Sequence, residues 1–248
     1  MSHCLKSYLV SSDRQFGFKK GTGCANAIYT LRKVIDNLTQ NNSTISVCSL
    51  DLSKAFDNLN HCILFNKLMD RNVPCVFIKL LNCWYSKVYN VVKWENEVST
   101  LFKLSSGVRQ GGILSPDSFS VYVNDVLVKL EKQQLGCHIK LRCFNSIMYA
   151  DDLMLLSLSV NHLEKLIKFC VREFNLLDLD INLNKSGCMR IGDRHHVNNV
   201  SLFIGDQMLH WKCEIRYLGV VIVSARRFTI NQQNFKQKLY RSLNGIFW

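Results

Sequence analysis

The spacing of apolar residues along the chain predicts both helices and strands. Four segments place apolar residues three and four positions apart, which is the period of an amphipathic helix. These predicted helices are 24–40, 61–70, 76–85 and 163–177. Other segments alternate or are rich in β-branched residues, which favours strands. The predicted strands are 45–52, 188–191, 201–204 and 215–223. This order predicts a mixed fold with helices covering a central sheet.

Three further segments carry turn or capping signals. Ser115-Pro116-Asp117 combines a capping residue, a first-turn proline and a carboxylate near the positive end of the helix dipole, which predicts a helix start. The segment 90–104 is typical of a hairpin that turns near Glu95-Asn96. The segment 144–157 is apolar on both sides of two adjacent acids. It therefore predicts a buried hairpin with the acids at its tip.

Three acids interrupt strands that are otherwise apolar: Asp51, Asp151 and Asp152. A carboxylate on buried β structure is costly unless it is paired or neutralised. Taken singly, each acid could be an ordinary turn residue, because Asp is common in turns. Together at neighbouring strand ends they would form an oxygen-ligand site that suits Mg²⁺. Two Mg²⁺ ions so held can clamp the attacking and leaving oxygens of a phosphoryl transfer.

Charge and composition narrow the class of protein. The 248 residues include 31 Lys and Arg against 19 Asp and Glu, a net charge of +12. This excess favours a polyanionic partner such as nucleic acid. Hydrophobic residues make up 48% of the chain, which excludes wholesale disorder.

The cysteines and the N-terminus indicate a compartment. Eleven scattered cysteines without C-x-x-C spacing favour a reducing environment, so no disulfide-linked partner is expected. The first residues lack the apolar core of a signal peptide, and no apolar run approaches the ~20 residues that span a membrane. We therefore expect an intracellular protein of the cytoplasm or nucleus that is not secreted and has no membrane partner.

Several segments, in order, resemble the motifs of reverse transcriptases. Those that resemble motifs A to E are SLDLSKAFD (49–57), GVRQGGILSP (107–116), YADD (149–152), INLNKS (181–186) and YLG (217–219). Upstream, RQFGFKKG (14–21) resembles a fingers segment of non-LTR retrotransposon enzymes. The ordered match covers nearly the whole chain. The chain thus resembles the reverse transcriptase domain of a non-LTR, LINE-like retrotransposon, apparently truncated.

The resemblance implies an α+β fold of the right-hand polymerase type. Its palm would be an antiparallel sheet with helices packed on one face. Residues 1–43 would be partial fingers, 44–224 the palm with an inserted fingers segment, and 225–248 the start of a thumb. The implied activity is RNA-directed DNA polymerase, a two-metal nucleotidyl transfer to a primer 3′-OH. Its partners would be an RNA template, a DNA primer and deoxynucleoside triphosphates, with two Mg²⁺ ions as cofactor.

The resemblance also implies the catalytic residues. Asp51 and Asp151 would bind both Mg²⁺ ions, with Asp152 assisting as a third metal ligand. Lys185 matches the lysine proposed to protonate the leaving pyrophosphate, a general-acid role worth roughly a hundredfold. A solvated lysine is an equally good interpretation of Lys185 taken alone.

Substrate contacts follow from the same comparison. Phe56 matches the aromatic steric gate, whose ring leaves no room for a ribose 2′-hydroxyl. Taken alone, Phe56 could be a core residue, the glycines of 107–112 an ordinary turn, and YLG a buried strand. The implied nucleotide contacts are Phe56, Arg109, Gln110, Gly111 and Tyr149. The implied template and primer contacts are Arg14, Phe16, Lys19, Tyr217, Leu218 and Gly219.

Two other functions remain open at the level of sequence. One is a nucleic-acid-binding remnant of a decayed element that is catalytically weak or inactive, which the +12 charge would fit. The other is a group II intron-type maturase, although no maturase-type domain is recognisable. Because the fingers and thumb segments are short, we expect the chain by itself to extend primers weakly.

Overall fold

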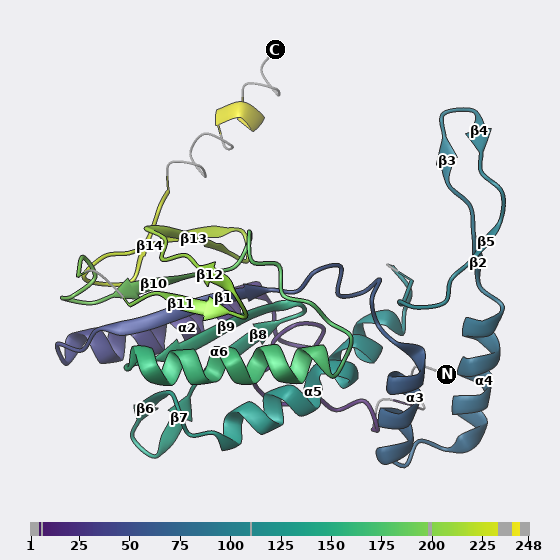
Figure 1. Cartoon of the computed structure of the whole chain (residues 1–248), viewed down its shortest axis with the longest axis horizontal. Helices are drawn as coiled ribbons and strands as arrows, with labels where there is room; N and C mark the ends of the chain where they lie inside the picture. Colours follow the sequence, from purple (N-terminus) through teal and green to yellow (C-terminus); the bar gives the residue numbers. More distant parts are fainter. Residues whose placement is uncertain (1–4, 6, 110, 198–199, 233–239, 244–248) are drawn as a thin grey trace.

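A four-stranded antiparallel sheet forms the centre of the computed structural model, which describes residues 5, 7–109, 111–197, 200–232 and 240–243 (Figure 1). The strand order is β10-β1-β9-β8. The bounds are β1 Ile45–Asp51, β8 Ser146–Tyr149, β9 Asp152–Ser157 and β10 Gly187–Ile191. Strand β1 lies between β9 and β10, with Val47 opposite both Leu156 and Met189. This arrangement confirms the predicted strands at 45–52 and 188–191 and the hairpin with acids at its tip.

Helices cover both faces of this sheet, because β1 is apolar on both sides. Cys48 and Leu50 face a core that includes residues of helices α3, α5 and α6. Ile45 and Val47 face the opposite core, built on helix α2 and the small sheet β13-β14-β15. The helix bounds are α2 Cys24–Gln40, α3 His61–Asp70, α5 Ser115–Lys132 and α6 Val160–Asn175. The expectation that helices pack on one face was therefore wrong, since α2 covers the other face.

Helix positions otherwise follow the apolar pattern closely. Helices α2 and α3 have the predicted bounds, and α4 (Cys75–Ser86) exceeds its prediction by one residue at each end. Helix α5 begins at Ser115 with Pro116 in its first turn, which confirms the predicted helix start. Ser115 is not the cap, however: Leu114 occupies the cap position without a side-chain hydrogen bond, and the Ser115 hydroxyl donates to the Arg109 carbonyl. Helix α6 begins three residues before its predicted start.

The segment 215–223 is two strands rather than one. Strands β13 (Glu214–Tyr217) and β14 (Val220–Val223) pair antiparallel, and β15 (Thr229–Ile230) pairs with β14. The reversal falls at Leu218 and Gly219, whose φ angles are 47° and 86°. A continuous apolar run hides this turn from a periodicity analysis, because only the glycine signals it.

A long hairpin arm, residues 87–104, projects away from the rest of the molecule (Figure 1). It contains two short strand pairs and turns at Glu95, with φ 52°, which confirms the predicted hairpin. Its strands are β2 Tyr89–Asn90, β3 Lys93–Trp94, β4 Glu97–Val98 and β5 Phe102–Lys103.

Two small hairpins complete the fold. They are β6–β7 (Cys137–Ile139 and Arg142–Phe144) and β11–β12 (Leu202–Ile204 and Gln207–Leu209). Strand β11 contacts α6, and β6 contacts α2. Within the described ranges, no helix is both long enough and apolar enough to cross a membrane.

Candidate active site

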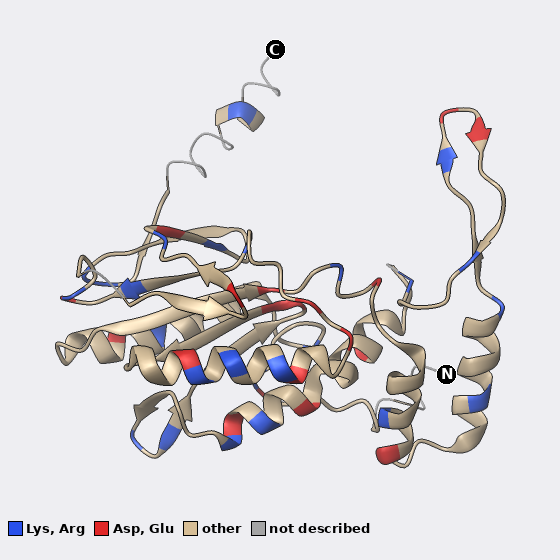
Figure 2. Cartoon of the chain, in the orientation of Figure 1, with Lys and Arg blue, Asp and Glu red and all other residues tan. Residues whose placement is uncertain are grey.

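Two of the three predicted acids face each other across the central sheet. Strand β1 ends at Asp51, and its antiparallel partner β9 begins at Asp152, so the two residues are directly opposite in register. Opposite residues of antiparallel strands lie on the same face, with Cα atoms about 5 Å apart. Asp151 precedes Asp152 in the β8–β9 turn. Acidic ribbon segments lie side by side at this end of the sheet in Figure 2.

The segment that contains Lys185 docks against the same strand end. Asp51 donates its backbone N–H to the Ser186 hydroxyl (3.1 Å), and its carbonyl accepts from the Asn182 N–H (2.8 Å). These contacts bring Lys185 Nζ to 3.5 Å from Asp51 Oδ2. The Lys185 side chain is 68% exposed, so it lies at the rim of the site. The structure thus brings together all four predicted catalytic residues.

The carboxylates at this site repel one another. Burial raises the pKa of Asp151, an effect that the charge of Asp51 increases, whereas a backbone hydrogen bond and Lys185 lower it. Burial, followed by the charges of Asp151 and Asp51, raises the pKa of Asp152 to about 6. One lysine therefore does not balance the negative charge of the three acids, which leaves the site suited to a cation.

A cavity of about 390 Å³ opens beside these residues and is lined from two sides. Asp51, Asp152 and Lys185 form one wall. The opposite wall comes from the β13–β14 hairpin, including Leu218 and Gly219 of its turn. Sequence reasoning missed Lys212 and Arg216, which also line the cavity and whose charges suit a phosphate-bearing ligand.

Tyr217 differs from its two neighbours in the YLG segment. Its side chain is 1% exposed and belongs to the core on the α2 face of the sheet. Its hydroxyl has no hydrogen-bond partner among the described residues. Burial and the nearby Asp152 raise the pKa of Tyr217. The hairpin therefore presents Leu218 and Gly219 to the cavity and anchors itself through Tyr217.

The acids do not form a closed metal cage. Within the described part of the chain, no three His, Cys, Asp or Glu side chains converge closely enough to hold an ion by themselves. Mg²⁺ is commonly bound by one or two carboxylates that share it with waters and substrate phosphates. The residues present fit that open mode, because Asp51 and Asp152 line a cavity with room for such ligands.

Gln15 holds the turn that carries Asp151. Its side chain is 1% exposed, and its amide bonds both backbone groups of Ala150, accepting from N–H at 3.0 Å and donating to C=O at 3.1 Å. Gly17 donates its N–H to the same Gln15 oxygen (2.9 Å). A Cβ on Gly17 would lie 2.5 Å from the Ala150 nitrogen, so only glycine permits this approach. The amide thereby stabilises Ala150 at φ 55°, in the left-handed region.

Sequence reasoning missed Gln15, although it singled out its neighbours. The contact joins positions 135 residues apart, and no local pattern signals it. A polar residue without charge between two predicted template contacts was the sole available hint. The RQFGF segment also pairs with β8, because Phe16 N–H donates to the Met148 carbonyl and Met148 N–H donates to the Arg14 carbonyl, both at 2.8 Å.

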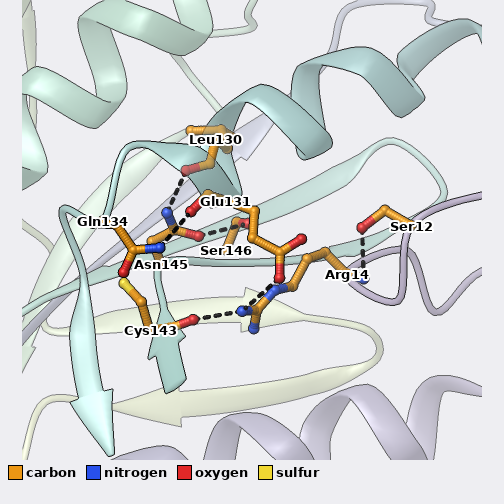
Figure 3. Close-up of polar contacts among 8 residues, drawn as sticks. All are labelled: Ser12, Arg14, Leu130, Glu131, Gln134, Cys143, Asn145 and Ser146. Atoms are coloured by element: carbon orange, nitrogen blue, oxygen red, sulfur yellow. Dashed lines mark hydrogen bonds and ion pairs between the residues drawn. The ribbon is translucent and has the colours of Figure 1, made fainter. Parts of the chain in front are cut away.

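The predicted template residues lie apart from the cavity and contact the scaffold. Arg14 donates to the Cys143 carbonyl (2.5 Å) and approaches Glu131 Oε1 at 3.4 Å (Figure 3). Lys19 donates to the Ser12 carbonyl (2.7 Å). Phe16 packs half-buried against the core on the α2 face. The predicted nucleotide contact Tyr149 is also half-buried, and a hydrogen bond with Cys24 raises its pKa.

A buried amide ties the start of β8 to the end of α5 (Figure 3). Asn145 is fully buried, and it donates to the Leu130 carbonyl at 2.6 Å. Its side-chain oxygen accepts from the Ser146 hydroxyl at 3.2 Å. Arg14, which contacts both α5 and β7, closes the same network. Polar contacts therefore fix both ends of β8, the strand that leads into Asp151.

Phe56 and residues 107–109 lie together beside the β1 end. The Phe56 ring is half-buried, stacks on Phe119 at 4.8 Å between centroids, and meets Phe18 edge-on at 6.0 Å. Its carbonyl accepts from Val108 N–H (2.8 Å). Gly107 has φ 85°, and a Cβ there would lie 2.7 Å from the Asp57 carbonyl oxygen, so this close approach requires glycine.

The remaining predicted nucleotide contacts lie at positions 109–111. Arg109 and Gly111 are exposed, and the Arg109 carbonyl accepts from the Ser115 hydroxyl at 2.5 Å. The predicted contact Gln110 lies outside the described residues.

Telomerases are among the solved structures that share this fold. Apo telomerase from Candida tropicalis, truncated from its C-terminal domain, superposes with a TM-score of 0.62 at 15% identity, covering 93% of this chain and 44% of that one. The telomerase from the same organism in complex with a fragment of telomeric RNA gives 0.64 at 13% identity, covering 94% and 36%. At these identities the likeness shows a shared fold alone.

The sequence gives the family. Residues 1–222 match the model of "Reverse transcriptase (RNA-dependent DNA polymerase)", so the chain belongs to the reverse transcriptase family. A Pol polyprotein of the type-2 retrotransposable element R2DM of Drosophila melanogaster is 25% identical over 92% of this chain and 22% of its own length. The polymerase of the mobile element jockey of Drosophila funebris is 21% identical over 91% and 25%. The chain thus spans about a quarter or less of the length of these relatives. The family match and the retrotransposon relatives together confirm the resemblance to non-LTR elements.

Replacing Gln15 with Leu should destabilise the protein by at least about 2 kcal/mol. The substitution keeps the volume but leaves the Ala150 N–H and C=O without partners in a buried setting. Urea denaturation measures the change, with Gln133→Leu, at an exposed position after α5, as the matched control. Equal stability of the two variants would show that the Gln15 amide does not hold the turn.

Replacing Asp152 with Asn should stabilise the metal-free protein above pH 6 but not below pH 4. The folded state keeps the Asp152 proton up to about pH 6, whereas the unfolded state releases it near pH 4, so the wild type loses stability between these values. Because Asp152 is half-exposed, solvent screening limits the difference to about 1–2 kcal/mol.

The measurement is urea denaturation across pH 3.5 to 8, compared with Asp206→Asn in the exposed β11–β12 turn. A constant difference between wild type and Asp152→Asn at every pH would contradict the raised pKa.

Proposed function

We propose that this chain is the catalytic core of an RNA-directed DNA polymerase of a non-LTR retrotransposon. The observation that carries the proposal is the pairing of Asp51 with Asp152 across two strands, with Asp151 in the adjoining turn. Membership of the reverse transcriptase family and the retrotransposon relatives support the same activity. The reaction joins a deoxynucleoside triphosphate to the 3′-OH of a DNA primer on an RNA template and releases pyrophosphate.

Asp51 and Asp151 would hold two Mg²⁺ ions, with Asp152 as a further ligand. The unbalanced negative charge of the three acids supports this assignment, because a bound cation removes their mutual repulsion. When bound, the metal supplies positive charge at the attacking 3′ oxygen and at the triphosphate. The protein's part is positioning, since the register of β1 on β9 fixes the spacing of the carboxylates.

Lys185 would protonate the leaving pyrophosphate. Its amine lies 3.5 Å from Asp51 and is largely exposed, so it can turn from the carboxylate to a phosphate in the cavity without moving the backbone. The transfer moves a proton from Nζ to the bridging oxygen as the bond to the α-phosphorus breaks.

Phe56 would act as the steric gate against ribonucleotides. Its ring is half-buried beside the β1 end, and the stack on Phe119 fixes its orientation. A ring so held cannot move aside for a 2′-hydroxyl. The neighbouring segment with Arg109, Gln110 and Gly111 would contact the incoming nucleotide, and Tyr149 would contribute from the β8 side.

The primer and template would lie along the cavity. Leu218 and Gly219 line it and would support the primer terminus, with Tyr217 as their buried anchor. Arg14, Phe16 and Lys19 would contact the template only from the segment's exposed side, because their polar groups already bond within the chain. In this proposal residues 1–43 are partial fingers, 44–224 the palm, and 225–248 the start of a thumb.

Replacing either Asp51 or Asp151 with Asn should abolish Mg²⁺-dependent primer extension. The amide removes a charge that the metal requires while keeping the size of the side chain. Extension of a DNA primer on an RNA template is measured for wild type, the two variants and the control Asp206→Asn.

Near-wild-type extension by Asp51→Asn or Asp151→Asn would remove the two-metal assignment. Template binding without any extension by the wild type would favour a nucleic-acid-binding remnant. Extension confined to one structured intron RNA would favour a maturase.

Replacing Phe56 with Val should raise ribonucleotide incorporation relative to deoxyribonucleotide incorporation by about tenfold or more, which corresponds to ~1.4 kcal/mol of discrimination. The loss of the Phe119 stack should also destabilise the fold by roughly 1–4 kcal/mol. Phe169→Val, which shortens a half-buried ring on α6, is the matched control for destabilisation alone. A folded Phe56→Val protein with unchanged sugar selectivity would refute the gate.

A further inference from the structure

A second cavity lies at the opposite end of the central sheet from the three acids. It encloses about 330 Å³ between the turn after α2, the start of β1 and the segment after β10. Its polar lining includes Asn42, Ser43, Thr44, Ser46, Arg190 and Arg194. Ser46 lies five residues before Asp51 on β1, so the two sites are about 17 Å apart along the strand and, because side chains alternate, they open on opposite faces of the sheet.

The second cavity carries positive charge that the protein itself does not neutralise. Neither Arg190 nor Arg194 forms an ion pair with a carboxylate in the part of the chain that the structure describes. The acid between them in the sequence, Asp193, instead pairs with Arg226 at 3.3 Å. Burial and the charge of Arg194 lower the pKa of Arg190. Two guanidinium groups facing one space are costly unless an anion joins them.

The cavity is built by specific contacts rather than by two freely moving side chains. The Arg190 guanidinium lies over the Trp211 ring at 5.5 Å, and Trp211 is fixed by donating to the Val200 carbonyl at 3.0 Å. Arg194 donates its backbone N–H to the Thr44 hydroxyl at 3.0 Å. Gly192, with φ 132°, permits this approach, because a Cβ there would lie 2.6 Å from the Thr44 Cα.

We propose that this cavity binds a phosphate group of the nucleic-acid backbone at a point remote from the reaction. Guanidinium groups match phosphate oxygens with paired hydrogen bonds, and the surrounding hydroxyl and amide groups can donate further ones. The net charge of +12 favours a polyanion over a single small anion.

The test measures binding separately from catalysis. An Asp151→Asn background without added metal is used, so the result does not depend on the proposed polymerase activity. Fluorescence anisotropy gives the affinity of the full chain for a labelled RNA–DNA hybrid between 50 and 200 mM salt. The variant is Arg190→Ala with Arg194→Ala, and the control is Lys140→Ala with Arg142→Ala, which removes two exposed charges from the β6–β7 hairpin.

We expect the cavity variant to lose at least about tenfold more affinity for the hybrid than the control variant. The slope of log affinity against log salt should also fall by about one unit more than in the control, because each phosphate contact contributes about 0.9 to that slope. Arg194→Ala alone, at an exposed position, should also lower the affinity for the hybrid. This single variant replaces the double variant in the test if the double variant fails to fold. Equal losses in cavity and control variants would overturn the proposal. Calorimetry with inorganic phosphate tests the alternative ligand, the free ion. If the double variant Arg190→Ala with Arg194→Ala loses phosphate binding but keeps its affinity for the hybrid, the proposal is also overturned.

Discussion

The antiparallel register of β1 on β9 is the constraint on which the rest of the structure depends. It places Asp51 opposite Asp152 and, on alternate positions, buries apolar residues on both faces of the sheet. A slip of one residue would turn Asp51 toward the core of α5 and α6 and place Leu50 or Leu52 at the site. Packing and chemistry are therefore specified by the same pairing, since the apolar residues that hold the register also aim the carboxylates.

The turn between β8 and β9 is held from outside the sheet. Ala150 adopts a left-handed conformation that is unfavourable for a residue with a side chain, and the Gln15 amide compensates by bonding both of its backbone groups. Asn145 and Arg14 fix the other end of β8. Strand β8, which leads into Asp151, is thus held at both ends by hydrogen bonds that involve residues 14–15 and the end of α5. Such support around a reactive turn allows precise positioning of side chains that repel one another.

Most helices and strands, and the residues that make up the candidate site, could be predicted from the sequence. Helices α2 and α3 have one apolar face each, and β1 ends where the apolar run meets Asp51. The grouping of the acids with Lys185 required a family resemblance, because no local pattern relates positions more than a hundred residues apart. Three features could not be predicted: the face of the sheet that α2 covers, the hydrogen bonds of Gln15 to the turn at Ala150, and the burial of Tyr217 in the core. Each depends on tertiary contacts, and a buried polar group has the same letter in the sequence as an exposed one.

The two ends of the central sheet present opposite and complementary electrostatic situations. At one end, burial together with the neighbouring carboxylates raises the pKa of Asp151 and Asp152, and Lys185 offsets only part of this effect. At the other, burial and the charge of Arg194 lower the pKa of Arg190 beside a polar cavity. Like charges gathered in this way reduce the stability of the fold, so packing does not explain them. A cation at the acidic end and a phosphate at the basic end would each convert a repulsion into an attraction. Under the proposed function, metal ions would supply the first attraction, and under the further inference a backbone phosphate on the other face of the sheet would supply the second.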